Sequence, residues 1–128
     1  MPLARKRVLV VDDEMLIALE TERKLLKAGC TVIGPAARLA PAIAMAREEA
    51  PDAAVLDVNL AGSMVWPLAE ELSSRGIPFV LVSEYGSALE VPKELEKVPR
   101  LGKPLSEADL IKALASVVMS SQAADANS

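Results

Sequence analysis

The sequence predicts an α/β domain built around a five-stranded parallel sheet. Three short apolar runs carry this prediction, and they cover residues 8–11, 53–56 and 79–82. Runs that are apolar at every position are typical of strands buried on both faces of a parallel sheet. Amphipathic helical patterns separate the runs, so strands and helices alternate along the chain.

Two weaker strands complete the expected sheet. Residues 31–33, Thr-Val-Ile, predict a short strand, and Leu101 predicts a weak strand at the opposite edge. Strict alternation implies right-handed crossovers with helices on both faces of the sheet. Among doubly wound arrangements, five strands favour the flavodoxin-like order 2-1-3-4-5, in which ligands bind at the carboxyl ends of the strands.

The first helix is expected from about Glu14 to Ala28, ending at Gly29, a residue suited to the left-handed C-terminal position. Its leucines at positions 16, 19 and 26 are expected to face the core.

The later helical patterns differ in how clearly they end. The last helix is expected to begin near Glu107, because residues 106–109 read as a capping box. Pro92 falls inside the pattern at residues 87–97 and predicts a short or kinked element there. After Met119 the chain is small and polar, which predicts one domain over residues 1–119 and a disordered tail over residues 120–128.

Composition excludes several classes of function. The 128 residues suffice for one domain, and no apolar run approaches the roughly 20 residues that cross a membrane. A net charge of −4 and three aromatic residues argue against direct nucleic-acid binding. The sequence has no histidine, which excludes a Ser-His-Asp triad.

Cys30 has no disulfide partner within the chain, and no export signal is visible. Both observations favour a location in the cytoplasm.

Polar side chains follow four of the predicted strands. They are Asp12 and Asp13 after the first strand, Asp57 after the third, Ser83 after the fourth and Lys103 after the fifth. Each has an ordinary explanation alone, such as a helix cap or a turn residue. Together they predict a cluster of carboxylates, which repel one another unless a cation is present. Oxygen ligands in small number favour Mg²⁺, with Lys103 neutralising the remaining charge.

Such a cluster suits phosphoryl transfer, in which catalysis consists mainly of positioning and charge neutralisation. An aspartate can act as the nucleophile and form an acyl phosphate. Asp57 is the central candidate for that nucleophile.

The sequence resembles the receiver domains of two-component response regulators. The segments that carry the resemblance are VLVVDDE, AVLDVNL, VLVSE and LGKP, and the match covers residues 7–119. The resemblance implies that Asp57 is the phosphoacceptor and that Ser83 and Lys103 contact phosphoryl oxygens. It also implies that Asp13 binds Mg²⁺ directly, that Asp12 binds it largely through water and that the backbone carbonyl of Asn59 is a further ligand. The peptide bond before Pro104 is expected to be cis.

Within this family the chain resembles short bacterial receivers whose fourth strand reads Pro-Phe-x-x-x-Thr-Gly-Tyr. Ser83 stands where that pattern has threonine, and Glu84 adds a negative charge beside the site. Arg100 stands where many receivers carry the tyrosine or phenylalanine that rotates on phosphorylation, so the chain departs from the family's usual aromatic switch at this position.

The resemblance implies a stand-alone regulator rather than an enzyme. A histidine kinase or a small acyl-phosphate donor would supply the phosphoryl group. The chain would then relay it to a histidine phosphotransfer protein, drain a kinase as a phosphate sink, or bind a downstream protein through a switched surface, and the sequence leaves these three outputs open. Two alternatives remain open. One is a receiver-like interaction module that is not phosphorylated, which Glu84 and Arg100 motivate. The other is a haloacid-dehalogenase-like phosphatase, whose nucleophile lies in an Asp-x-Asp pattern at the first strand, where this chain has Asp12-Asp13-Glu14.

Overall fold

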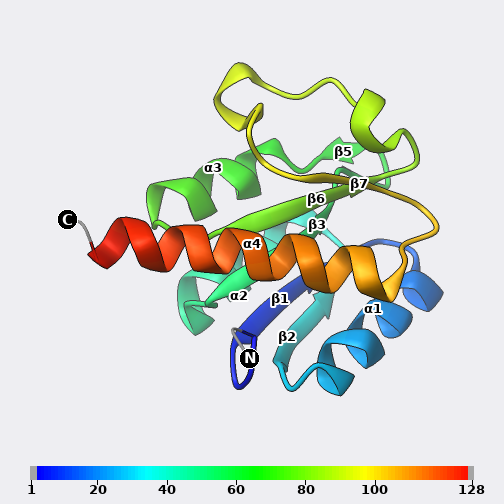
Figure 1. Ribbon diagram of the computed structural model, residues 1–128. Coiled ribbons are helices and arrows are strands. Elements are labelled where there is room, and N and C mark those ends of the chain that lie inside the picture. Colours follow the sequence, from blue (N-terminus) through cyan, green and yellow to red (C-terminus); the bar gives the residue numbers. More distant parts are fainter. Residues whose placement is uncertain (1–2, 127–128) are drawn as a thin grey trace.

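A computed structural model describes residues 3–126 of the chain. Its main sheet has five parallel strands in the order β2-β1-β3-β6-β7, which confirms the predicted topology (Figure 1). The strands are β1 (Arg7–Val11), β2 (Thr31–Ala36), β3 (Ala53–Asp57), β6 (Phe79–Ser83) and β7 (Arg100–Gly102). Every residue of β3 and β6 is buried, as expected of central strands in a sheet covered on both faces.

Four α-helices cover the sheet: α1 (Met15–Lys27), α2 (Leu39–Glu49), α3 (Trp66–Ser74) and α4 (Glu107–Ala126). Alternate residues of β1 point to opposite faces, so Leu9 and Val11 join one core while Val8 and Val10 join the other. The first core includes buried residues of α2 and α3, and the second includes those of α1 and α4. Within the described residues, none of the helices is both long and apolar enough to cross a membrane.

The buried face of α1 differs from the one that the sequence predicted. Leu16, Leu19 and Leu26 are 78%, 49% and 54% exposed, whereas Ala18 and Leu25 are buried. The first turns of α1 are apolar on several sides, so the sequence pattern did not define one face. A small side chain such as that of Ala18 lets the helix approach the sheet closely, and this packing decides the orientation.

Residues 84–99 form no α-helix. They contain two short 3₁₀ turns, η1 (Gly86–Ala88) and η2 (Lys93–Leu95), and Pro92 immediately precedes η2. The helix expected near residues 87–97 is therefore absent, whereas the expected interruption at Pro92 is present. Proline has no amide hydrogen to continue a helical ladder, so the chain restarts as a new turn after it.

A small hairpin that the sequence analysis did not predict follows β3. Its strands are β4 (Asn59–Leu60) and β5 (Ser63–Met64), which pair antiparallel. Ala61 and Gly62 form the turn with φ of 53° and 94°. Two central residues with positive φ are typical of the tight hairpin turns in which glycine is favoured.

The start of α4 follows the prediction and its end does not. The amide of Asp109 donates to Ser106 Oγ at 3.0 Å, so Ser106 caps the helix as expected. The helix continues to Ala126, so most of the tail predicted to be disordered is helical; residues 127–128 lie outside the described residues. Three of the seven residues from 120 to 126 are alanines, the residue with the highest helix propensity.

The orientation of α1 gives a direct test by substitution. Leu25→Ala should lower the free energy of unfolding by about 2–5 kcal/mol, because it leaves a cavity in a closed core. Leu16→Ala, the matched change on the exposed face, should alter it by less than about 0.5 kcal/mol. Urea denaturation of both variants would measure this, and equal losses would show that α1 is oriented differently.

Candidate functional site

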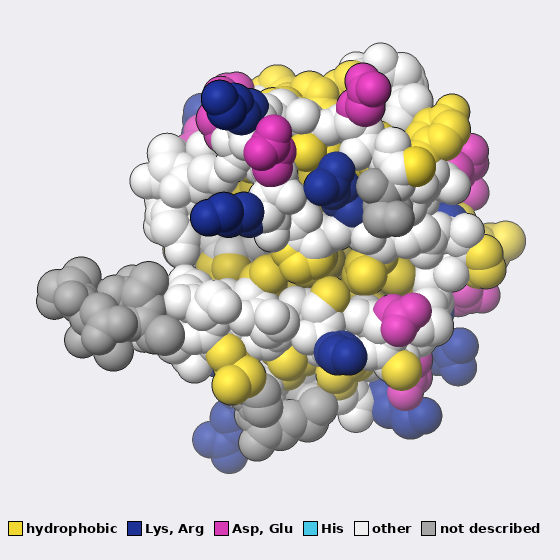
Figure 2. Space-filling model, turned by 45° about the horizontal axis from the view of Figure 1, so that its top comes forward, with side chains coloured by type: hydrophobic (Ala, Val, Ile, Leu, Met, Phe, Trp, Pro, Cys, Tyr) yellow, Lys and Arg dark blue, Asp and Glu magenta, His cyan; other side chains and the backbone are white. Residues whose placement is uncertain are grey.

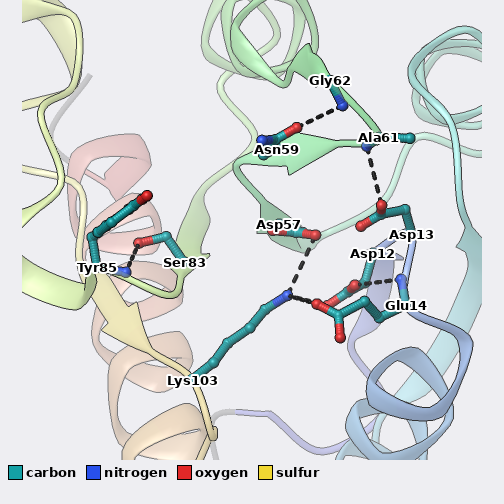
Figure 3. Close-up of polar contacts among 10 residues, drawn as sticks. All are labelled: Asp12, Asp13, Glu14, Asp57, Asn59, Ala61, Gly62, Ser83, Tyr85 and Lys103. Carbon is teal, nitrogen blue, oxygen red and sulfur yellow. Dashed lines mark hydrogen bonds and ion pairs between the residues drawn. The ribbon is translucent and has the colours of Figure 1, made fainter.

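The predicted site residues meet at the carboxyl edge of the sheet. Asp12 follows β1 directly, Asp57 is the last residue of β3, Ser83 is the last residue of β6, and Lys103 follows β7. Parallel strands end at the same edge, so these four residues lie near one another there although they are far apart in the sequence, and the side chains of Asp12, Asp57 and Lys103 point toward one another (Figure 3). Asp57, Ser83 and Lys103 line an open cavity of about 430 Å³, and Asp12 lies directly beside it.

Lys103 lies at the centre of the charged cluster. Its Nζ is 3.0 Å from Glu14 Oε1 and 3.4 Å from both Asp12 Oδ2 and Asp57 Oδ2. The lysine side chain is nearly buried, so solvent screens these interactions less than it screens surface ion pairs. The peptide bond between Lys103 and Pro104 is cis, as the resemblance implied.

Burial and like charges shift the pKa values of the carboxyl groups. Burial, followed by the proximity of Asp13 and Asp12, raises the pKa of Asp57 to about 7, although the charge of Lys103 acts in the opposite direction. Burial also raises the pKa of Asp12. Burial by itself would lower the pKa of Lys103, but the bond to Glu14 and the charges of Asp12 and Asp57 outweigh it and raise that pKa. The cluster therefore has an excess of negative charge that one lysine does not offset.

Asp13 is held by the β4–β5 hairpin. The amide of Ala61 donates to Asp13 Oδ2 at 3.1 Å, which fixes this carboxylate beside Asp57. Within the hairpin, the amide of Gly62 donates to Asn59 Oδ1 at 2.8 Å. The side-chain oxygen of Asn59 thus supports the turn, and its backbone remains at the rim of the cavity.

The hydroxyl of Ser83 faces away from Asp57. Ser83 Oγ accepts hydrogen bonds from the amides of Tyr85 and Gly86, both at 3.1 Å. Figure 3 shows the hydroxyl turned toward Tyr85, on the opposite side of the cavity from the carboxylates. The side chain of Tyr85 is largely exposed, and Glu84 adds its carboxylate to the cavity lining.

The carboxylates lie close enough to share one cation. One oxygen from each of Asp12, Asp13 and Asp57 can be chosen so that all three lie within 4.8 Å of one another. The donors are oxygens, and the cavity leaves room for water and a further ligand. A hard divalent cation that retains water, such as Mg²⁺, fits this donor set.

Two contacts of the site were not predicted from the sequence. Glu14 was recognised as an acidic neighbour, but its ion pair with Lys103 was not foreseen, although its place directly after Asp13 was a usable signal. The bond from Ala61 to Asp13 depends on the hairpin, for which the Ala-Gly pair was a weak signal.

Comparison with known proteins places this chain in a family. No family model matches the chain. SdrG from Sphingomonas melonis Fr1 is 37% identical, the alignment covers 92% of this chain and 98% of SdrG, and the TM-score is 0.78. The REC domain of the response regulator PhyR from Erythrobacter litoralis shares the fold with a TM-score of 0.81, at 22% identity and coverage of 93% and 94%. The chain belongs to the response-regulator receiver domains.

A curated relative of this receiver domain is larger. The transcriptional regulatory protein PdtaR of Mycobacterium tuberculosis is 29% identical over 112 residues, which represent 85% of this chain and 55% of PdtaR. The chain therefore spans about half the length of the curated relatives that it matches. The similarity concerns only that part of PdtaR.

Charge repulsion in the cluster predicts that Asp57→Asn stabilises the folded protein, and that this gain in the free energy of unfolding depends on pH. Since the pKa of Asp57 is raised to about 7 in the fold, the wild-type carboxylate destabilises the folded protein once the unfolded chain can ionise, above about pH 4. In chelator at pH 8, Asp57→Asn should therefore raise the free energy of unfolding by at least about 1 kcal/mol. Near pH 4 the gain should disappear. Denaturation curves at both pH values would measure it, and a gain that is the same at both would contradict the repulsion.

Proposed function

We propose that this receiver domain is a Mg²⁺-dependent phosphoacceptor and that Asp57 carries the phosphoryl group. One observation supports the proposal most strongly. Asp57 lies at an open cavity between the carboxylates of Asp12 and Asp13 and the ammonium of Lys103, whose Nζ is 3.4 Å from Asp57 Oδ2. This arrangement provides a nucleophile, a cation site and a fixed positive charge around one point.

The reaction follows from what each side chain can do. A carboxylate oxygen of Asp57 attacks phosphorus while the bond from phosphorus to the donor nitrogen or oxygen breaks, and the leaving group takes that electron pair. Lys103 offsets charge on the phosphoryl oxygens. Asp12, Asp13, Asp57 and the backbone carbonyl of Asn59 would hold Mg²⁺, which when bound supplies charge neutralisation at the same oxygens. Attack requires Asp57 to be ionised, and a bound cation would lower its raised pKa.

The proposed output is a contact with another protein. Ser83 would turn toward the phosphoryl group and change the residues that follow it, which biases one surface between two conformations. The donor would be a histidine kinase or a histidine phosphotransfer protein of a bacterial cytoplasm, because this chain has no histidine of its own. The chain would act as a phosphoacceptor that turns over its own phosphoryl group and not as an enzyme on other substrates.

Charge distribution supports a protein partner rather than a nucleic acid. On the face drawn in Figure 2, Lys and Arg side chains lie singly among Asp and Glu side chains and form no basic patch. A receiver-like module that is not phosphorylated is the second candidate, and the contact of Lys103 with Glu14 favours it. That contact, at 3.0 Å, is shorter than the contact of Lys103 with Asp57.

Intact-mass analysis tests the proposal against this second candidate. Incubation with Mg²⁺ and acetyl phosphate or phosphoramidate should add the mass of one phosphoryl group to the wild type. The adduct should be absent with chelator and in Asp57→Asn. Ser63→Ala, a hydroxyl change in the exposed β5 strand, serves as a control that should still form the adduct. A wild type that forms no adduct with either donor, or with a histidine kinase, would favour the non-phosphorylated module.

A further inference from the structure

Residues 84–99 join the site to the edge of the sheet without forming a helix. The segment leaves the carboxyl end of β6 and runs back along that edge of the sheet to the start of the parallel strand β7 (Figure 1). Its packing against the core includes the buried Leu95 and the half-buried Leu89 and Val98. Short 3₁₀ turns satisfy few of their own carbonyl groups, so the segment depends on contacts from outside it.

Arg100 supplies two of these contacts from β7. Its guanidinium donates to the carbonyl of Leu89 at 2.7 Å and to the carbonyl of Glu96 at 3.2 Å. Leu89 is the C-terminal cap residue of η1, and Glu96 is the C-terminal cap residue of η2. One side chain therefore closes the ends of both turns, and we call this pair of contacts the Arg100 clamp.

A guanidinium suits this geometry better than other side chains do. It presents five N–H donors in a rigid plane and can reach two carbonyls at once, whereas a lysine ammonium acts as a single point charge. A charged donor also strengthens each bond to a neutral carbonyl. An aromatic ring at position 100 could not make these contacts.

Ser83 holds the other end of the same segment. Its Oγ accepts the amides of Tyr85 and Gly86, so both of its lone pairs are used at the start of η1. The backbone there also packs against β7, because a methyl group built on Gly86 would lie 3.4 Å from the Cα of Gly102. If the hydroxyl turns toward a phosphoryl group on Asp57, it leaves these two amides.

We propose that the Arg100 clamp and the Ser83 hydroxyl together hold residues 84–99 in the conformation of the unphosphorylated protein. On phosphorylation the Ser83 hydroxyl leaves the amides of Tyr85 and Gly86. The Arg100 clamp then sets how far residues 84–99 open. Arg100 is thus the residue that determines the amplitude of the switch. We call the release of Ser83 from its two amides on phosphorylation the trigger. The trigger rests on the proposed function, whereas the Arg100 clamp does not.

Hydrogen exchange followed by mass spectrometry tests the clamp in the unmodified protein. Two amides bonded inside the turns report opening of the segment: the amide of Leu89 donates to the carbonyl of Gly86, and the amide of Leu95 donates to the carbonyl of Pro92. Arg100→Met removes the guanidinium and keeps an apolar stem. It should speed exchange in residues 84–99 by about tenfold or more, because two charge-assisted bonds are lost. Arg100→Lys should give an intermediate increase.

A matched arginine change elsewhere separates the clamp from a general loss of stability. Arg47 also makes two guanidinium contacts, both to Glu71 across α2 and α3. Arg47→Met should leave exchange in residues 84–99 at the wild-type rate. Unchanged exchange in this segment in both Arg100→Met and Arg100→Lys, with the fold intact by circular dichroism, would overturn the clamp.

A second arm tests the trigger in protein whose Asp57 adduct has been verified by mass. The adduct should speed exchange around η1 in the wild type, and Ser83→Ala should speed it without any adduct. Unchanged exchange in verified adduct would overturn the trigger and leave the clamp standing. Failure to form the adduct would count against the proposed function, whereas the first arm would still decide the clamp.

Discussion

The charges at the carboxyl edge of the sheet constrain this structure more than any other feature. Asp12 and Asp57 are buried beside the exposed Asp13, and Lys103 supplies one positive charge within 3.4 Å of the two buried carboxylates. Buried carboxylates brought this close are unfavourable for folding when they are ionised, and the raised pKa values of Asp12 and Asp57 reflect that cost. Folding tolerates the cluster because the apolar strands fix where each carboxylate stands. The same excess of negative charge favours binding of any ligand that brings positive charge into the cavity.

Much of the fold could be predicted because the strands are apolar throughout and the helices alternate with them. The order of the sheet followed from that alternation together with the number of strands. The face of α1 could not be predicted, because Met15, Leu16 and Leu19 give it apolar residues on the side that faces solvent. Only the fit of Ala18 and Leu25 against the sheet selects the buried side. The extension of α4 was missed for a similar reason, since a small polar tail is compatible with either state.

The positions of the site residues were predictable because parallel strands end at a common edge. Asp12, Asp57, Ser83 and Lys103 each end or follow a strand, so their convergence required only the topology. Contacts that depend on loop geometry were beyond the sequence. The bonds of Arg100 to Leu89 and Glu96 exist because Pro92 divides the segment into two turns whose ends face β7. The sequence marked Arg100 as unusual, but it did not indicate what the guanidinium contacts.

The dependence of thermal stability on Mg²⁺ tests the central claim, that the three aspartates form a cation site, most directly. At constant ionic strength and pH 7.5, the melting temperature of the wild type should rise as Mg²⁺ is added, because ligand that binds the folded state stabilises it by about 2.7 kcal/mol at one hundred times Kd. Asp13→Asn should lose most of this rise, and Asp52→Asn, a change outside the cluster, should keep it. A melting temperature that does not respond to Mg²⁺, or that responds equally in wild type and Asp13→Asn, would contradict the account.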